Sequence, residues 1–220
     1  ICYLVFMIAS GILFFTGQDI LLAIFAFTLA DIFLVLAAYS TNSPYSFIGA
    51  ERELIQMMAS EPMILIAAVG MFMATKSFKI LDIVNTHSNL IFQLPGIFIG
   101  LLFILTIKLR KSPFDLSTSH HAHQEIVKGV TTEFAGPSLA LVEIAHWYET
   151  AIMLGMLCLF FAANPAVALG VTLAAYFIEI LIDNTFARFK WEMTLKWSWL
   201  ITIVFGALNL IILFIIEKAR

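Results

Sequence analysis

The residues from Ile20 to Tyr39 read ILLAIFAFTLADIFLVLAAY, and Asp31 is the only charge among them. A helix rises about 1.5 Å per residue, so a run of about 20 apolar residues crosses the hydrocarbon core of a bilayer. Further apolar runs lie on both sides, and in lipid each must satisfy its own backbone hydrogen bonds. We therefore expect seven transmembrane helices: Ile1 to Thr16, Ile20 to Tyr39, Leu54 to Thr75, Leu94 to Leu109, Leu139 to Ala162, Val167 to Asp183, and Trp197 to Ile216.

The composition of the whole chain agrees with a multi-pass membrane protein. Hydrophobic residues make up 61% of the 220 residues and charged residues 12%, whereas a soluble domain carries about 25% charged residues. This excludes a soluble enzyme. The two cysteines, Cys2 and Cys158, lie in apolar runs without a CxxC partner, so we expect no disulfide scaffold, no metal site and no redox centre on this chain. A net charge of −3 without a basic run argues against nucleic acid as a partner.

These runs predict an all-α fold, a polytopic transmembrane bundle that forms one domain over residues 1–220. We expect a long loop at 110–138 and medium loops at Ser40 to Ala50, Lys76 to Gln93 and Asn184 to Lys196. Eight Lys and Arg residues flank the side that carries the long loop and four flank the other, which predicts a cytoplasmic loop and an outside C-terminus. Since the sequence begins inside an apolar run, we expect Ile1 to follow a missing N-terminal part and not to begin a signal peptide.

Six carboxylates lie within or at the ends of the predicted spans. An ionised group at the centre of a bilayer costs about 2.5–3.5 kcal/mol on insertion scales, so each is a candidate functional group. Glu179 and Asp183 are four residues apart on one helix face, and His146 lies three residues from both Glu143 and Glu149. One alternative is that the acids pair with cations and only fix the helix register. Because the helix centres contain no Lys or Arg, we favour a proton or ion path through Asp31, Glu61, Glu143, His146, Glu149, Glu179 and Asp183.

The long loop contains three histidines within the string SHHAHQE at 119–125. Imidazole and carboxylate groups at this spacing are able to bind a metal ion, and Glu143 and His146 have the Glu-x-x-His spacing of di-iron bundles. Those bundles need a second Glu-x-x-His on another helix, and the chain has none. We therefore favour a pH-responsive polar interface or a proton entrance over a metal site, and a solvated loop is the remaining alternative.

Motifs on both sides of this string are specific to one family. The loop reads RKSPFDL at 110–116, EIVKG at 125–129 and TEFAG at 132–136. These strings resemble the PFD…E-L-V-x-G…E-Y/F-S/A-G signature of the membrane subunit that lines the quinone chamber of respiratory complex I. The segment GAERELIQM at 49–57, followed by Glu61, is similar to the G-A-x-R-x-x-x-Q-M…E stretch of the same subunit.

Two further strings resemble a different branch of that family. SHHAHQE stands where complex I has an acidic E-A-E-x-E run, and complex I lacks a counterpart of HWYE at 146–149. Both strings are similar to the homologous subunit of energy-converting NiFe hydrogenases, including the ferredoxin-linked and formate hydrogenlyase types. The resemblance runs from the second span to the C-terminus. It implies a fold of eight helices, with the first helix and an amphipathic helix before Ile1.

The resemblance implies a subunit that anchors a peripheral arm and couples electron transfer there to H⁺ or Na⁺ translocation. It implies a NiFe centre and iron–sulfur clusters on the large and small subunits of that arm, none on this chain, and antiporter-like membrane subunits as further partners. By position, the acidic funnel into the membrane would contain Glu61, Glu125, Glu133 and Glu143. The arm-facing surface would include Arg52, Glu53, Arg110, Asp115, His120, His121 and His123, and the histidines replace acids of a quinone chamber.

We therefore expect a non-catalytic membrane subunit of an energy-converting hydrogenase in the cell membrane, in which ferredoxin-driven hydrogen evolution changes the proton occupancy of buried carboxylates. A sulfur-reducing complex and an NADH/quinone oxidoreductase are alternatives within the family, because the terminal reaction depends on metal ligands of another subunit. A stand-alone ion transporter is an alternative of another class. The seven helices and the acids favour it, and purification without metal-containing partners would support it.

Overall fold

The computed structural model of the chain describes residues 1–86, 89–118 and 127–219, and these ranges form a helical bundle without a strand. The helices are α1 (Cys2–Phe15), α2 (Ile20–Tyr39), α3 (Pro44–Thr75), α4 (Ile80–Asn85), α5 (Pro95–Lys108), α6 (Pro137–Cys158), α7 (Pro165–Thr185), α8 (Trp191–Ile201) and α9 (Leu208–Ala219). Short turns of 3-10 helix are η1 (Leu90–Phe92), η2 (Gly129–Thr131) and η3 (Leu159–Phe161), and η4 (Thr202–Ala207) is a π-helical stretch between α8 and α9.

Seven apolar helices are present in the described part of the chain. Five are long enough to cross a membrane: Ile20–Tyr39, Pro44–Thr75, Pro137–Phe161, Pro165–Thr185 and Trp191–Lys218. Two shorter apolar helices are Cys2–Phe15 and Pro95–Lys108. Each predicted span corresponds to one of these helices, which confirms an all-α membrane bundle.

Prolines and a cap fix where several helices begin. Four helices, α3, α5, α6 and α7, begin with Pro, whose missing N–H is not needed in the first turn of a helix. The carboxylate of Asp19 caps α2, because it accepts hydrogen bonds from the backbone N–H groups of Leu21 and Leu22 at 2.8 and 3.3 Å. Gly17 has a φ of +77°, which Gly adopts without strain. The chain therefore reverses between α1 and α2 in the tight turn that the sequence predicts.

Three connections that the sequence predicts as loops are partly helical. Helix α3 begins at Pro44 and not at Leu54, and α8 begins at Trp191 and not at Trp197. The predicted loop from Lys76 to Gln93 contains α4 and η1. Hydropathy marks the part of a helix that suits lipid, so it misses polar turns at the helix ends. The predicted loops were too long for this reason.

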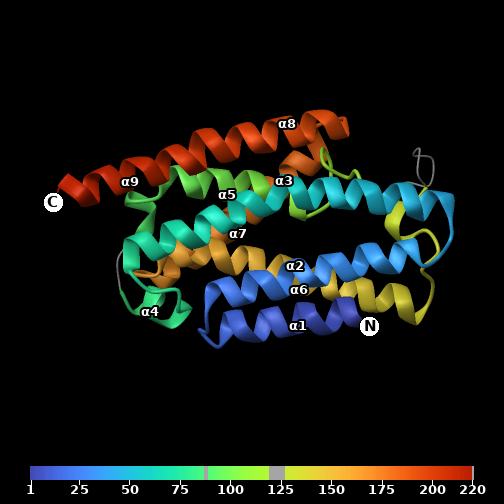
Figure 1. The fold of residues 1–220 in the computed structure, drawn as a ribbon, viewed down its shortest axis with the longest axis horizontal. Coiled ribbons are helices and arrows are strands. Elements are labelled where there is room, and N and C mark those ends of the chain that lie inside the picture. The colour runs from blue at the N-terminus through green and yellow to red at the C-terminus, as the bar shows by residue number, and fades with distance from the viewer. Residues whose placement is uncertain (87–88, 119–126, 220) are drawn as a thin grey trace.

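Helix α3 is central and packs against α2, α5 and α8, while α1 packs against α2 and α6 (Figure 1). Glycine permits close packing here, because a Cβ on Gly100 would overlap the side chain of Met63. Met63 and Leu101 are almost completely buried. The outer helices differ, since Leu173 of α7 and Phe214 of α9 are about three-fifths exposed. Such faces are typical of helices that contact lipid.

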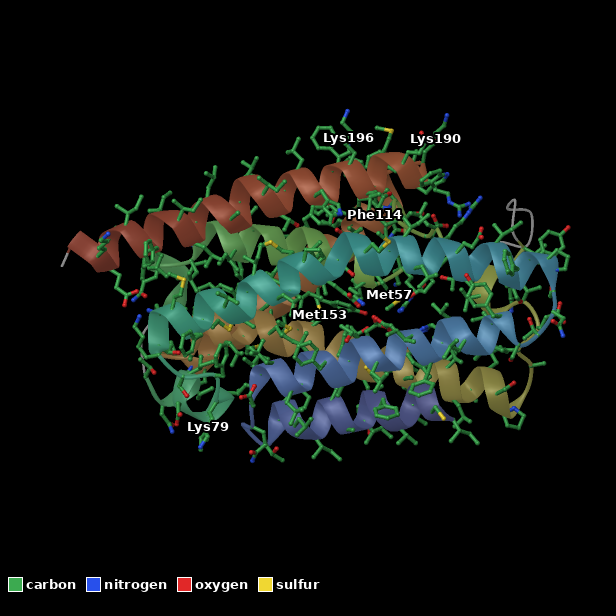
Figure 2. The ribbon with its side chains drawn as sticks, in the orientation of Figure 1. Met57, Lys79, Phe114, Met153, Lys190 and Lys196 are labelled. Carbon is green, nitrogen blue, oxygen red and sulfur yellow. The ribbon has the colours of Figure 1, made fainter. Side chains whose placement is uncertain are left out.

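The connections gather at two opposite ends of the bundle. Figure 1 shows α4 and the C-terminus toward one end and the connection between α2 and α3 at the other. Lys79 lies at the α4 end, as Figure 2 shows. At this end, Lys76 at the end of α3 pairs with Glu217 of α9. The sequence-based assignment of the cytoplasmic and outer ends stays a prediction.

Candidate functional site: a buried ion-pair network beneath the long loop

Two cations at the end of α5 gather three carboxylates from three other helices. Lys108 is the last residue of α5, and Arg110 follows it by two positions. The carboxylates are Asp31 of α2, Glu53 of α3 and Glu149 of α6, and none of the five side chains is more than 6% exposed. We call these five residues the ion-pair network. In Figure 2, the labelled Met57 and Met153 mark two of the helices that surround it, α3 and α6.

Arg110 joins α3 to α6 through one guanidinium group. Its Nη2 lies 2.6 Å from Oε1 of Glu53, and its Nε lies 3.1 and 3.2 Å from the two oxygens of the same carboxylate. Its Nη1 donates to Oε2 of Glu149, and its Nη2 lies 3.5 Å from Oδ1 of Asp31. The Nζ of Lys108 lies 2.5 Å from Oδ2 of Asp31 and 3.7 Å from Oε1 of Glu149. Asp31 and Glu149 therefore contact both cations.

The two cations are stable in the interior because carboxylates replace the water that they have lost. Burial lowers the pKa of the Arg110 guanidinium, but the nearby Glu149 and Glu53 carboxylates raise it, and the pKa lies well above its ordinary value. Arg110 therefore stays charged, and its planar group suits a two-point contact with a carboxylate. The Nζ of Lys108 also lies 4.6 Å from the centre of the Phe27 ring, a cation–π distance.

The network corrects one premise of the sequence interpretation. The sequence predicts buried acids without cationic neighbours, and this is wrong, because Lys108 and Arg110 enter the interior. Long cationic side chains near the end of a span usually extend toward water, whereas these two are buried. The available signal was Lys108, which lies inside the apolar run from Leu94 to Leu109.

Tyr3 of α1 extends the network toward α6. Its hydroxyl donates to Oε2 of Glu149 at 3.4 Å, and its ring packs edge-on against His146 with the ring centres 5.8 Å apart. The sequence gives no signal for Tyr3, since 146 residues separate it from Glu149. On α6, Glu149 points into the network, His146 is half-buried and Glu143 is exposed. The three residues do not form the continuous polar stripe that their spacing suggests.

The PFD motif of the long loop is packed into the bundle. Phe114 and Asp115 are each 3% exposed. The Nε2 of Gln56 in α3 donates to the carbonyl oxygen of Phe114 at 2.7 Å, and the Phe114 ring packs edge-on against Phe103 of α5. The Nε of Arg188 lies 3.1 Å from Oδ1 of Asp115. Side chains from three separate segments thus anchor this part of the loop.

The second described part of the loop is held by the GAERELIQM segment. Gly49 in α3 lies so close to η2 that a Cβ would overlap the backbone nitrogen of Val130. The N–H of Val130 donates to the carbonyl oxygen of Ser117 at 3.0 Å, which ties the two parts of the loop together. Gly129 has a φ of +56°, which favours glycine. The motifs on which the resemblance depends therefore contact one another.

A mostly polar cavity of about 360 Å³ adjoins the network on the loop side. Its walls include three network residues, loop residues and parts of α6 and α7: Lys108, Arg110, Glu149, Lys111, Lys128, Thr131, Glu143, His146 and Tyr176. A water molecule occupies about 30 Å³ of liquid, so this cavity has room for several. Buried charges and titratable groups of the loop side thus share one space that water can fill.

Three acids of the predicted funnel lie apart from the network. Glu61 precedes Pro62 inside α3 and is half-buried, and its Oε1 is buried without a hydrogen-bond partner among the described residues. Glu143 lines the polar cavity but is exposed, and Glu133 is exposed in the loop. Glu125 lies outside the described residues.

The two acids of α7 lie on the opposite side of α5. Glu179 is 6% exposed. Asp183 is half-buried and accepts a hydrogen bond from the backbone N–H of Ser112 at 3.0 Å. The Nζ of Lys111 lies 3.8 Å from the same carboxylate. Asp183 therefore connects α7 to the start of the long loop.

The predicted arm-facing residues are less exposed than a docking surface requires. Glu53 and Arg110 belong to the network, Asp115 is buried beside Arg188, and Arg52 is half-buried. The histidines of the predicted interface lie outside the described residues: His120, His121 and His123. Within the described residues, no three His, Cys, Asp or Glu side chains gather as ligands of a metal ion. The interface and path roles of all these residues stay predictions.

The fold and the site together define a class of protein: a multi-pass helical membrane protein with a charged network beneath an anchored loop. The family described as NADH dehydrogenase matches residues 1–214. The chain therefore belongs to the NADH dehydrogenase family and is one of its complex I-like membrane subunits.

Similar curated proteins are membrane subunits of NADH-quinone oxidoreductases. The chain is 24% identical over 203 residues to the one from Syntrophotalea carbinolica, a match that covers 87% of this chain and 61% of the relative. It is 28% identical over 181 residues to the one from Carboxydothermus hydrogenoformans, covering 81% of this chain and 45% of the relative. The chain thus spans less than two thirds of the length of these relatives.

The fold also matches a solved structure, that of the membrane-bound sulfane sulfur reductase, an archaeal respiratory membrane complex. The TM-score is 0.82 at 22% identity, and the match covers 97% of this chain and 80% of the other. At this identity the likeness supports the fold. The homologues are subunits of multi-subunit membrane respiratory complexes.

Proposed function

We propose that this chain is the coupling subunit of an energy-converting NiFe hydrogenase in the cytoplasmic membrane. It anchors a cytoplasmic arm, whose large subunit carries the NiFe centre and whose small subunit carries iron–sulfur clusters, and it works beside antiporter-like membrane subunits. Ferredoxin-driven hydrogen evolution in the arm is coupled to H⁺ or Na⁺ translocation. The chain contributes no redox centre of its own.

The observation that carries this proposal is the ion-pair network with its polar cavity. Lys108 and Arg110 leave the end of α5, where the long loop begins, and contact acids from three other helices. A displacement of the loop would move both cations relative to those acids and change the electrostatic potential in the cavity. Glu143 and His146 line that cavity and are able to exchange protons with water in it. An event at the loop thereby acts on proton occupancy inside the bundle.

The hydrogenase branch of the family is favoured by the strings SHHAHQE at 119–125 and HWYE at 146–149. The structure adds a role for the second string, since His146 contacts Tyr3 and Glu149 belongs to the network. A sulfur-reducing complex is an alternative that the likeness in fold to the sulfane sulfur reductase favours. These two assignments use the same membrane mechanism and differ in the chemistry of the arm.

A quinone-reducing complex is the second candidate, and a different cavity favours it. An apolar cavity of about 680 Å³ lies where α1, α2 and α6 meet near Tyr3, with Phe33, Leu34, Phe134 and Leu141 in its walls. Such walls suit the hydrocarbon tail of a quinone. Saturable binding of a quinone to the purified complex, with electron transfer to it, would establish this alternative.

The proposal is tested on the native complex purified through a tag on this chain. We expect nickel- and iron-containing subunits to co-purify, and the complex in lipid vesicles to move ions when reduced ferredoxin is supplied. A protein that purifies alone would support a stand-alone transporter. Sulfur reduction without hydrogen evolution would assign the sulfur-reducing branch.

Glu143→Gln and Glu61→Gln test whether the acids take part. Each variant should lose ion translocation while it retains hydrogen evolution and its nickel and iron content. Glu192→Gln is the matched control, because Glu192 is exposed at the start of α8. Unchanged translocation in both path variants would refute the assignment of these two acids.

A further inference from the structure

Glu179 occupies the inward-facing seam of α7. The buried residues of this helix are Ala168, Thr172, Ala175 and Glu179, which follow one another at spacings of four, three and four. This spacing places them on one helix face. The Oγ1 of Thr172 lies 3.0 Å from the Sγ of Cys158 in α6, which confirms that the face is directed into the bundle. The carboxyl group of Glu179 therefore lies inside the protein and not in lipid.

Glu179 differs from the network acids in its lack of partners. It is 6% exposed, and within the described residues it makes no hydrogen bond or ion pair. By contrast, Asp31, Glu53 and Glu149 each contact Lys108 or Arg110. A carboxylate in apolar surroundings is stable only if it is paired, hydrated or protonated. At Glu179, water or a proton has to fill this requirement.

A cavity of about 360 Å³ opens beside Glu179, between α5 and α7. Its walls are mainly apolar and include Phe98, Leu102 and Phe103 of α5. Thr106 of α5 is the other polar side chain among the described lining residues, and its hydroxyl donates to the carbonyl oxygen of Phe103 at 2.5 Å. Glu179 is the only titratable side chain that lines the cavity in the described part of the chain. Water in this cavity would meet one carboxyl group and no fixed cation.

Asp183 connects this position to the long loop. It lies one helical turn beyond Glu179, and spacing by four residues places both on neighbouring parts of one face. Asp183 accepts a hydrogen bond from the N–H of Ser112 at 3.0 Å and lies 3.8 Å from the Nζ of Lys111. Both contacts are residues of the loop segment that also carries the PFD motif. A shift of this segment would change the surroundings of Asp183 first.

We propose that Glu179 is the carboxyl group that takes up and releases the transported proton, with Asp183 as its link to the long loop. Uptake adds one proton to a carboxylate oxygen of Glu179, release returns that proton to water, and no electron is transferred at this site. The network acids keep their contacts with Lys108 and Arg110 and hold the loop in place. This inference rests on the proposed function, because it assumes that the complex moves protons.

The test uses the complete complex in vesicles, with proton movement and redox turnover measured in the same sample. Glu179→Gln should reduce proton movement to the leak rate while redox turnover continues. Glu179→Asp keeps a carboxyl group and should retain proton movement, and it also serves if the Gln variant fails to assemble. The exposed Glu192→Gln is again the control. Full proton movement by Glu179→Gln would overturn the inference.

Infrared difference spectroscopy supplies a second readout on the wild-type complex. The carbonyl stretch of a protonated carboxyl group should appear and disappear with pH or turnover, be absent from Glu179→Gln and be shifted in Glu179→Asp. A band that is identical in all three proteins would overturn the inference, as would a band that never changes. If the wild-type complex moves no protons, the proposed function itself fails. That result is distinct from a wild type that pumps and a Glu179 variant that pumps equally well.

Discussion

Replacing Arg110 with Met should destabilise the bundle strongly, because it leaves a buried carboxylate without a cation. Asp31 and Glu149 would keep Lys108, at 2.5 and 3.7 Å. Glu53 has Arg110 as its ion-pair partner within the described residues and would keep none. Breaking a buried ion pair from one side costs about 3–5 kcal/mol. For a chain of this size about 1 kcal/mol corresponds to 2–4 °C in Tm, so the expected loss is about 6–20 °C.

The assay is thermal unfolding of the purified complex in lipid discs, followed by circular dichroism of the helices and by release of this chain. Adding Glu53→Gln to Arg110→Met removes the unpaired charge and should recover part of the loss. Lys111→Met is the matched control, because the Lys111–Asp183 pair is 40% and 29% exposed; such pairs contribute about 0–1 kcal/mol. If Arg110→Met costs no more than Lys111→Met, or if the double variant is no more stable than Arg110→Met, the ion-pair reasoning is wrong.

Three further changes have outcomes that follow from the packing. Gly49→Ala should cost about 1–3 kcal/mol by overpacking and should speed hydrogen exchange at η2, because the new Cβ overlaps Val130; unchanged exchange would contradict the close approach. Phe114→Ala should cost about 3–5 kcal/mol and loosen the loop, measured as faster proteolysis after Arg110, whereas the wild-type cleavage rate would show that the ring does not anchor it. Lys76→Gln should change stability by less than about 1 kcal/mol, since its pair with Glu217 is 59% and 47% exposed, and a Tm drop as large as that of Arg110→Met would contradict this.

Hydropathy was sufficient to predict the membrane fold. The span from Ile20 to Tyr39 is a helix over those same residues, since lipid solvation and helix length define it together. The start of α3 was missed by ten residues, from Leu54 back to Pro44. The polar turns between them are helical because Gly49 packs on η2 and Glu53 meets Arg110, contacts that no local pattern records.

The candidate site was predictable only in part. The buried acids Asp31 and Glu149 stand out in the sequence, because charges are rare in apolar runs. Their partner Lys108 is 77 residues from Asp31, and Arg110 is 57 residues from Glu53. Pairing over such separations depends on how the helices pack, which one sequence does not specify. The same limitation hid the difference between the paired acids and Glu179.

The membership of the ion-pair network has a consequence for stoichiometry. Three ionised carboxylates surround two cations, so the group carries one negative charge that Lys108 and Arg110 leave unbalanced. A single monovalent cation would bring the sum to zero, and a second would make the interior positive and raise the electrostatic energy again. The network therefore has an intrinsic capacity of one charge, and any quantity that it gates is counted singly.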